Sequence, residues 1–202
     1  MSKTPARASK AAAGPSVPAE TANGLRKREI VETAAVIFRR SGYRDASMRQ
    51  IAQEAGIQGA SLYYHFPSKQ ALYVEVHALV LGRAESEVLT AISHHQDPWT
   101  RLEAACVRHL EMQVDPSSAT LPLMNELPLV EREIRDVLVT HRDSFERVYQ
   151  QLVDALPLPQ SFDRHLYRIL LLSTLNNAAS WFHSGRHSVA DVAREIVRIF
   201  RH

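Results

Sequence analysis

The chain has 202 residues, of which 45% are hydrophobic, enough to bury a core in one large domain or in a small and a larger one. It has no run of about 18 apolar residues that could span a membrane. No apolar block follows the basic residues Lys3, Arg7 and Lys10, as it would in a signal peptide. Its single cysteine, Cys106, cannot form an internal disulfide. We therefore expect a reduced, cytoplasmic protein with no signal peptide, no membrane span and a buried or inert thiol.

The net charge of +2 conceals an asymmetry. Residues 1–70 carry 11 Lys/Arg and 5 Asp/Glu, whereas residues 71–202 carry 13 and 17. A basic first third favours an anionic partner docking at one end, although solvated basic faces are also common.

Residues 1–24 are rich in Ala, Ser, Pro and Lys/Arg and almost lack large apolar side chains. Such a segment cannot pack, and we predict a disordered basic tail. A tail of this kind either contacts a nucleic-acid backbone or minor groove or has no partner.

Four helices are predicted after the tail. The first starts at Leu25 and stops at the glycine of "SGY" (41–43), and the second starts at Ser47, which has capping-box spacing to Gln50. Gly56 ends the second helix, and Pro67 stops the third, "GASLYYHF". Ser68 caps a fourth helix that continues to about His94.

The rest of the chain is also predicted to be helical. A helix is expected to start at Asp97-Pro98, and prolines 116, 122 and 128 divide the region after it into short pieces. An apolar stripe from Ile134 to Leu156 then predicts a long helix, which ends at "PLP" (157–159). An apolar helix is expected over 161–184, and Ser188 with Asp191 starts the last. No segment alternates like a strand, so the prediction is an all-α fold of about nine helices.

The stretch "AGIQGASLYYHFPSK" places five large side chains in succession, from Leu62 to Phe66. Two short helices joined by a glycine turn and preceded by a basic segment are typical of a helix-turn-helix, whose second helix enters the major groove of DNA. Residues 51, 52, 57, 62 and 66 are expected to close its core. Tyr63, Tyr64 and His65 then remain outside, where they can donate to phosphate oxygens.

The segment "SMRQIAQEAGIQGASLYYHFPSKQAL" (47–72) resembles the DNA-binding signature of the TetR family of bacterial repressors, and the resemblance covers residues 25–72. It implies a homodimer with a helix-turn-helix domain at 25–70 and a ligand-binding and dimerisation domain at 71–202. In this family a small effector releases the protein from a palindromic double-stranded DNA operator. No enzymatic activity, cofactor or metal is implied.

The resemblance also assigns roles to single residues. The phosphate contacts fall on Ser47, Tyr63, Tyr64, His65 and Lys69, and the entry of the recognition helix falls on Gln58, Gly59 and Ser61. Arg49 is placed for a phosphate or a guanine edge. Because Gln58 stands where the family often has a capping Ser or Thr, and Gly59 has no side chain, Arg49, Gln58 and Ser61 are expected to carry most of the specificity.

The C-terminal stretch 170–200 resembles a subgroup of the family that senses fatty-acyl and other carboxylic CoA thioesters. The candidate pocket residues are Met112, Leu123, Met124, Phe145, Tyr149, Asn177 and Trp181; the competing interpretation is that they are plain core. Arginines 132, 135, 142 and 168 are candidates to bind the phosphates of such a thioester at the pocket mouth. The carboxylates of Glu111 and Glu126 support the alternative hypothesis, a sensor of lipophilic cations that controls an efflux gene.

The last two helices are expected to pair with their mates in a dimer, burying Leu175, Ala178, Val192, Ile196 and Ile199. The alternatives to a repressor are weaker. "HRD" at 141–143 lacks the rest of a kinase signature, no nucleophile elbow or phosphate loop occurs, and His94–His95 has the character of a solvated pair. A structural DNA-bundling protein would need no sizeable second domain.

Overall fold

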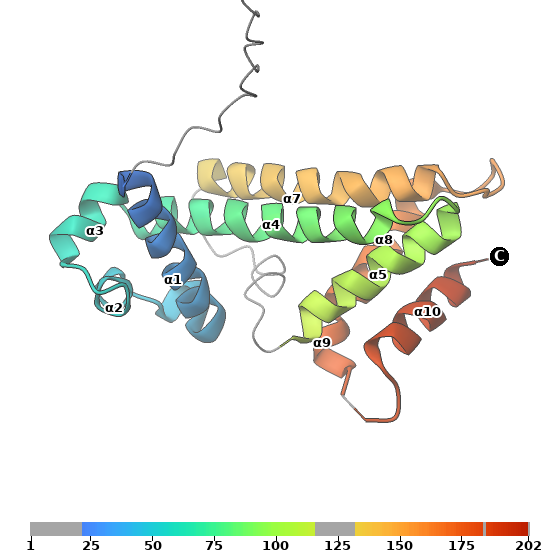
Figure 1. Cartoon of the computed structure of the whole chain (residues 1–202). Coiled ribbons are helices and arrows are strands. Elements are labelled where there is room, and N and C mark those ends of the chain that lie inside the picture. Colours follow the sequence, from blue (N-terminus) through green and yellow to red (C-terminus); the bar gives the residue numbers. More distant parts are fainter. Residues whose placement is uncertain (1–21, 116–131, 184, 202) are drawn as a thin grey trace, which may run out of the picture.

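The computed structural model describes residues 22–115, 132–183 and 185–201. These residues form helices joined by turns and loops, without a strand among them, so the all-α prediction is confirmed. Among the described residues, the first three helices lie at one end of the molecule and four helices lie at the other, and two long helices run side by side between them (Figure 1). No helix within the described ranges is long and apolar enough to cross a membrane.

The N-terminal helices follow the predicted order, but α1 begins at Ala22, three residues before the predicted start at Leu25; the rest of the predicted tail, residues 1–21, lies outside the described residues. Helix α1 spans Ala22–Asp45 and loses its helical geometry at Gly42, whose φ of 71° is costly for residues with a Cβ. Helix α2 (Met48–Glu54) starts after Ser47, whose Oγ accepts from the Gln50 backbone N–H at 3.2 Å. Gly56 adopts a φ of 64° in the turn to α3 (Gly59–His65), and Ser68 caps α4 (Lys69–Ser93).

The C-terminal helices differ from the prediction in one place. Asp97 caps α5 (Pro98–Val114) as expected, and α7 spans Arg132–Asp154. The single helix expected over 161–184 is wrong: α8 (Arg164–Asn176) starts only after Asp163, the backbone leaves helical geometry at Asn177, and α9 (Ala178–Trp181) follows. A complete capping box between Ser188 and Asp191 starts α10 (Val189–Phe200).

The buried apolar side chains form two clusters. One joins α1, α2, α3 and the first half of α4, and the other joins α5, α8, α10 and the second halves of α4 and α7. Ile51, Leu62 and Phe66 close the small cluster as predicted. Helix α7 contributes to both: Leu138 is fully buried in the small cluster, and Phe145 lies in the large one. Helices α4 and α7 therefore each contact both cores.

Cys106 lies fully buried in the large cluster, as predicted, and burial raises the pKa of its thiol well above the usual value. A thiol held neutral in this way is a poor nucleophile.

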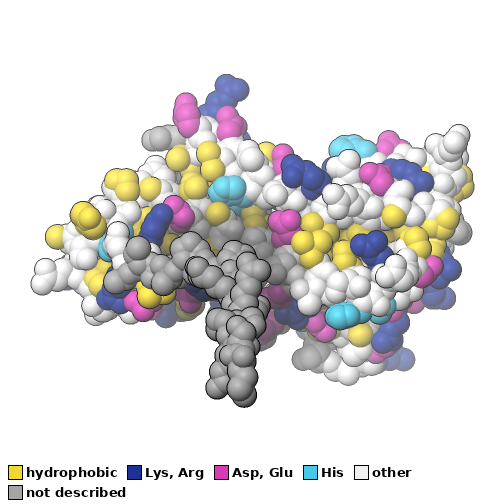
Figure 2. Space-filling view, turned by 45° about the horizontal axis from the view of Figure 1, so that its top comes forward, with side chains coloured by type: hydrophobic (Ala, Val, Ile, Leu, Met, Phe, Trp, Pro, Cys, Tyr) yellow, Lys and Arg dark blue, Asp and Glu magenta, His cyan; other side chains and the backbone are white. Residues whose placement is uncertain are grey.

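In the space-filling view, hydrophobic side chains also reach the surface at both ends of the molecule, among charged ones (Figure 2).

Candidate functional site

The surface formed by α2 and α3 gathers the residues that were predicted to read DNA. Arg49, Gln58 and Ser61 are exposed, and Gln58 precedes α3 without capping it through its side chain. A hollow of about 410 Å³ lies between the two helices and is bordered by Arg49, Gly59 and Tyr63. A Cβ added to Gly59 would meet no atom within 4 Å, so the glycine leaves this hollow open.

The aromatic run divides between core and surface as the sequence predicts. Leu62 and Phe66 are buried, whereas Tyr63 is 55% exposed and Tyr64 is 80% exposed. The ring of His65 is half-buried and packs edge-on against Tyr64, with 5.4 Å between the ring centroids. Two phenols and an imidazole are thus available at the open side of α3, where their N–H and O–H groups can donate to an anion.

Lys69 has a different environment from the one expected of a phosphate contact. Its Nζ donates to the backbone oxygens of Tyr43 (2.8 Å), Arg44 (3.1 Å) and Ala46 (2.9 Å), and it lies 4.6 Å from the centre of the Tyr43 ring. An ammonium has three N–H donors, and here all three are used. Lys69 therefore caps the end of α1 and fixes the turn that leads into α2.

Arg44 is a candidate DNA contact that the sequence analysis missed. Several cations of the helix-turn-helix region pair with carboxylates: Arg26 with Glu29 at 2.6 Å, Lys27 with Glu75 at 2.7 Å and Arg40 with Glu54 at 2.7 Å. Arg44 and Arg49 are exposed and form no ion pair within the described part of the chain. The signal in the sequence was a cation just before the cap of the second helix.

A cleft of about 500 Å³ separates α7 from α8. One wall is a stripe of α8 from His165 to Asn176, extended by Asn177 just after the helix end. The other wall comes from α7. The lining side chains are Arg142, Phe145, Glu146, His165, Arg168, Ile169, Leu172, Ser173, Asn176 and Asn177.

The charged groups of the cleft carry a positive excess. Arg142 and Arg168 flank one carboxylate, Glu146, at 3.6 and 3.5 Å. The Arg168 side chain is only 16% exposed, so its charge is poorly screened by water. Arg142 and Arg168 are two of the four arginines proposed for a pocket mouth, whereas Arg132 and Arg135 lie nearer the start of α7 and do not line this cleft.

The predicted pocket residues do not share one site. Phe145 and Asn177 line the cleft, whereas Met112 and Tyr149 are buried in the large hydrophobic cluster and do not border it. Trp181 is 47% exposed on α9. Leu123 and Met124 lie outside the described residues. For Met112 and Tyr149 the plain-core interpretation therefore fits better.

A buried polar network behind the cleft was not anticipated. His109 is fully buried on α5 and contacts Tyr149 Oη at 2.8 Å and Asn176 Oδ1 at 2.9 Å. Burial lowers the pKa of His109 to about 4, so the ring is neutral at pH 7. Gln113, one turn further along α5, also contacts Asn176. The sequence signal was a histidine and a glutamine at core positions of an amphipathic helix.

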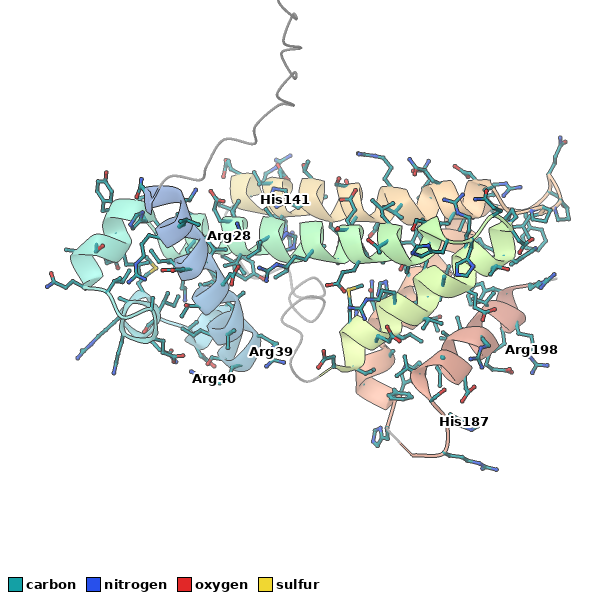
Figure 3. All side chains as sticks on the ribbon, in the orientation of Figure 1. Arg28, Arg39, Arg40, His141, His187 and Arg198 are labelled. Carbon is teal, nitrogen blue, oxygen red and sulfur yellow. The ribbon has the colours of Figure 1, made fainter. Side chains whose placement is uncertain are left out.

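A second buried histidine lies where α4 meets α7. His77 stacks on His141 of α7, the residue labelled in Figure 3, with 5.7 Å between the ring centroids. Neither nitrogen of His77 has a hydrogen-bond partner within the described residues. Burial, with the nearby positive charges of His141 and Arg142, lowers the pKa of His77 to about 4. Protonation of His77 would place a charge inside the contact between the two long helices.

The outer face of α8 and α10 is apolar and exposed. Leu166, Leu170 and Ile199 border a hollow of about 460 Å³ on this face. Of the residues predicted to meet a partner subunit, Leu175, Ala178 and Ile196 are instead buried within the one chain, because α10 packs on α5 beneath this face. Ile199, which is 65% exposed, remains available.

Comparison with known proteins gives matches along both parts of the chain. The profile of bacterial regulatory proteins of the tetR family matches residues 30–76, and the tetracyclin repressor-like C-terminal domain matches residues 95–202. The HTH-type transcriptional repressor KstR2 of Rhodococcus jostii (strain RHA1) is 27% identical over 190 residues, which cover 90% of this chain and 93% of KstR2.

Two solved structures illustrate the shared fold. AibR in complex with isovaleryl coenzyme A and operator DNA superposes with a TM-score of 0.74 at 22% identity, covering 86% of this chain and 97% of AibR. FadR from Bacillus subtilis in complex with stearoyl-CoA superposes with a TM-score of 0.73 at 13% identity, covering 86% of this chain and 96% of FadR. At these identities the similarity shows a common architecture.

Proposed function

The chain belongs to the TetR family of bacterial regulatory proteins, which are transcription factors and not enzymes. On that premise we propose that it binds a palindromic DNA operator and that an acyl-CoA releases it from this operator. The observation that carries the choice of effector is the cleft between α7 and α8. It has an apolar middle and two arginines around a single carboxylate. An elongated apolar molecule with an anionic end suits such a cleft.

The proposed DNA contacts lie on the surface of α2 and α3. Arg44 and Arg49 are the exposed cations at the start of α2, and Tyr63 and Tyr64 stand out from α3. Phosphate contacts position a protein on DNA, whereas side chains at the entry of the recognition helix, here Gln58 and Ser61, reach base edges. Ser47 and His65 complete the phosphate set.

Two relatives of the same fold support the effector class. The structures of AibR and FadR hold isovaleryl coenzyme A and stearoyl-CoA. The alternative effector, a lipophilic cation, requires unpaired carboxylates. Glu111 is held by Arg108 at 2.9 Å, and Glu146 in the cleft lies between two arginines. Both contacts favour an anion over a cation.

Helix α7 is the proposed link between effector and DNA. It supplies Arg142 and Glu146 to the cleft, while Leu138, one turn away, is buried in the core of the helix-turn-helix region. An effector that binds better when α7 is displaced shifts the population toward the displaced form. Tight binding to both forms alike would release nothing.

The experiment is a DNA release assay on the dimeric full chain. An operator is first selected from random DNA, and its release is then followed by fluorescence anisotropy with acyl-CoAs, free fatty acids and lipophilic cations. We expect release by acyl-CoAs, and loss of that response in Arg168→Met. Arg132→Met, on an arginine that is 90% exposed outside the cleft, is the matched control and should respond like wild type.

Three results would count against the proposal. Release by cations alone, with acyl-CoAs inert up to about millimolar levels, where binding is worth only about 4 kcal/mol, would indicate a sensor of lipophilic cations. Equal affinity for selected and random DNA would indicate a DNA-bundling protein. An Arg168→Met response equal to that of wild type would move the effector site elsewhere.

A further inference from the structure

The hollow between α2 and α3 has an apolar floor. Its least exposed members are Met48 and Ala52 of α2, which are buried, and Ile57 of the turn, which is half-buried against the small hydrophobic cluster. Apart from the weakly accepting sulfur of Met48, these side chains carry no hydrogen-bond donor or acceptor. The floor therefore favours an apolar group over a polar one.

The rim of the hollow is polar and exposed. It consists of Arg49 and Gln53 from α2 and Tyr63 from α3, so a guanidinium and a phenol stand on the two helices that enclose the floor. Both groups donate hydrogen bonds to anions. The hollow thus fits a partner with anionic groups at its edges and an apolar group between them. The major groove of DNA presents this combination, because phosphates border it and the 5-methyl group of thymine projects into it.

The absence of a side chain at Gly59 is not explained by the backbone. Gly59 starts α3 without a positive φ, whereas Gly56, three residues earlier, has one. A helix is less stable with glycine than with alanine, and a Cβ at position 59 would meet no atom within 4 Å. Neither φ nor crowding thus requires glycine here. What the glycine does provide is an open wall of the hollow.

We propose that the hollow admits the 5-methyl group of one thymine in each operator half-site, and that Gly59 determines this specificity by leaving room for it. The inference rests on the proposed function, because it concerns the same operator. The volume of about 410 Å³ exceeds that of a methyl group, so the base edge that carries the methyl can enter with it. Cytosine presents an amino donor in the same groove, and the floor offers this donor no side-chain oxygen. Thymine is therefore preferred there over cytosine.

The test replaces single thymines of the selected operator by deoxyuridine, which removes the methyl group and leaves base pairing unchanged. Each thymine is replaced in turn in both half-sites, and the affinity of the full chain is measured by fluorescence anisotropy. We expect one position to lose affinity about tenfold, a factor that corresponds to about 1.4 kcal/mol. Because the two operators differ only in the methyl group, their affinity ratio isolates its contact with the protein.

Variants then assign the loss to the hollow. Gly59→Leu fills the hollow with a side chain, so the operators with thymine and deoxyuridine at the sensitive position should bind equally well. Gly59→Ala should lower the ratio in part, and it serves if the leucine variant binds too weakly to measure. Ser61→Ala is the matched control, because Ser61 is exposed on the same helix and does not border the hollow. It should weaken binding to both operators and keep the wild-type ratio.

The outcomes separate this inference from the proposed function. If no thymine of the selected operator is sensitive to loss of its methyl group, or if the Gly59 variants keep the wild-type ratio, the role of the hollow is wrong while operator binding stands. If Ser61→Ala abolishes the ratio as well, the methyl group contacts another part of α3, which also overturns the inference. If wild type binds selected and random DNA equally, both proposals fail. The wild-type comparison needs no variant and holds even if a substitution prevents folding.

Discussion

Lys69 has a structural role that its predicted phosphate contact does not account for. The sequence places it beside the residues that grip DNA, and the structure places its ammonium on three backbone oxygens at the end of α1. The last carbonyls of a helix have no partners within the helix, and a cation there stabilises them. Arg164 does the same at the end of α7: it donates to the backbone oxygen of Val153 in the last turn, and to those of Leu156 and Leu158 in the loop that follows.

Lys69→Met should therefore lower stability rather than remove a phosphate contact. Loss of three charge-assisted hydrogen bonds should cost about 2 kcal/mol of unfolding free energy, measured by urea denaturation. The slope of log affinity against log salt for operator DNA should stay unchanged. Arg49→Met is the comparison: its stability should match wild type, and its slope should fall by about one if Arg49 contacts a phosphate. A reduced slope for Lys69→Met with full stability would restore the original assignment.

The sequence predicted the roles of single residues correctly where a side chain binds backbone groups a few positions away in the chain. Ser47, Asp97 and Ser188 cap helices as their spacing predicts. It did not work for contacts across the fold. Asn176 and His109 are 67 positions apart, and no local pattern distinguishes Asn176 from its neighbour Asn177. Tertiary packing alone decides which of two adjacent amides meets a buried histidine.

At the scale of elements, the turn between α2 and α3 depends on a single glycine. Gly56 has a φ of 64°, a left-handed conformation that costs other residues about 1 kcal/mol. Gly59, three residues later, begins α3 and has no such φ. The sequence assigned Gly56 to the end of the second helix, where glycine is the residue that most easily adopts a positive φ, and the structure confirms that place.

A matched pair of substitutions tests this difference. Gly56→Ala should lower the unfolding free energy by about 1 kcal/mol and weaken operator binding, because the angle between α2 and α3 changes. Gly59→Ala should fold with equal or higher stability, since its Cβ meets open space. Thermal unfolding of both variants gives the comparison. Equal losses for the two would show that the turn tolerates a Cβ at 56.

The contact between α4 and α7 should make stability depend on pH. His77 has its pKa lowered from 6.5 to about 4 in the folded chain. As the pH falls below 6.5, the unfolded chain binds a proton that the folded chain does not, so the unfolding free energy falls until about pH 4. Above pH 6.5 both states are neutral and the contribution is complete. The full loss is on the order of 3 kcal/mol.

His77→Phe should remove about one proton from this dependence. The measurement is the unfolding free energy by urea denaturation at several pH values between 7 and 4.5, where wild type should lose stability more steeply. His187→Phe, at an exposed position in the loop before α10 (Figure 3), is the control and should keep the wild-type slope. An unchanged slope in His77→Phe would mean that His77 is protonated in the folded protein or is not buried.

At the scale of the whole molecule, the exposed apolar face of α8 and α10 is the feature that predicts assembly. Leu166, Leu170 and Ile199 leave a hydrophobic hollow at the surface, and a second copy can cover it with the same face. The sequence predicted dimerisation through these two helices; of its interface residues, Leu175, Ala178 and Ile196 are buried within the chain, and Ile199 is exposed on this face. Helix α8 has apolar residues on both its buried and its exposed side, so periodicity alone does not tell which side packs within the chain.

Leu170→Glu combined with Ile199→Glu should give a folded monomer that binds the palindromic operator weakly, because only one half-site is engaged at a time. Sedimentation velocity measures the oligomeric state, and circular dichroism confirms the helical content. Leu89→Glu, at an exposed leucine of α4 away from this face, should leave the oligomeric state unchanged. A dimer that persists in the double variant would place the interface on another surface.

The burial of Leu138 in the small hydrophobic cluster bears on how such proteins can be recombined. The simplest hybrid regulator would be cut after the helix-turn-helix and joined to a foreign sensor. In this chain such a cut separates Leu138, and the half-buried Ile134 beside it, from the core that they cover. A chimera that transplants the first three helices should therefore also carry the opening turns of α7, or a recipient helix with apolar side chains in the same register. The unit that can be exchanged is thus discontinuous in sequence.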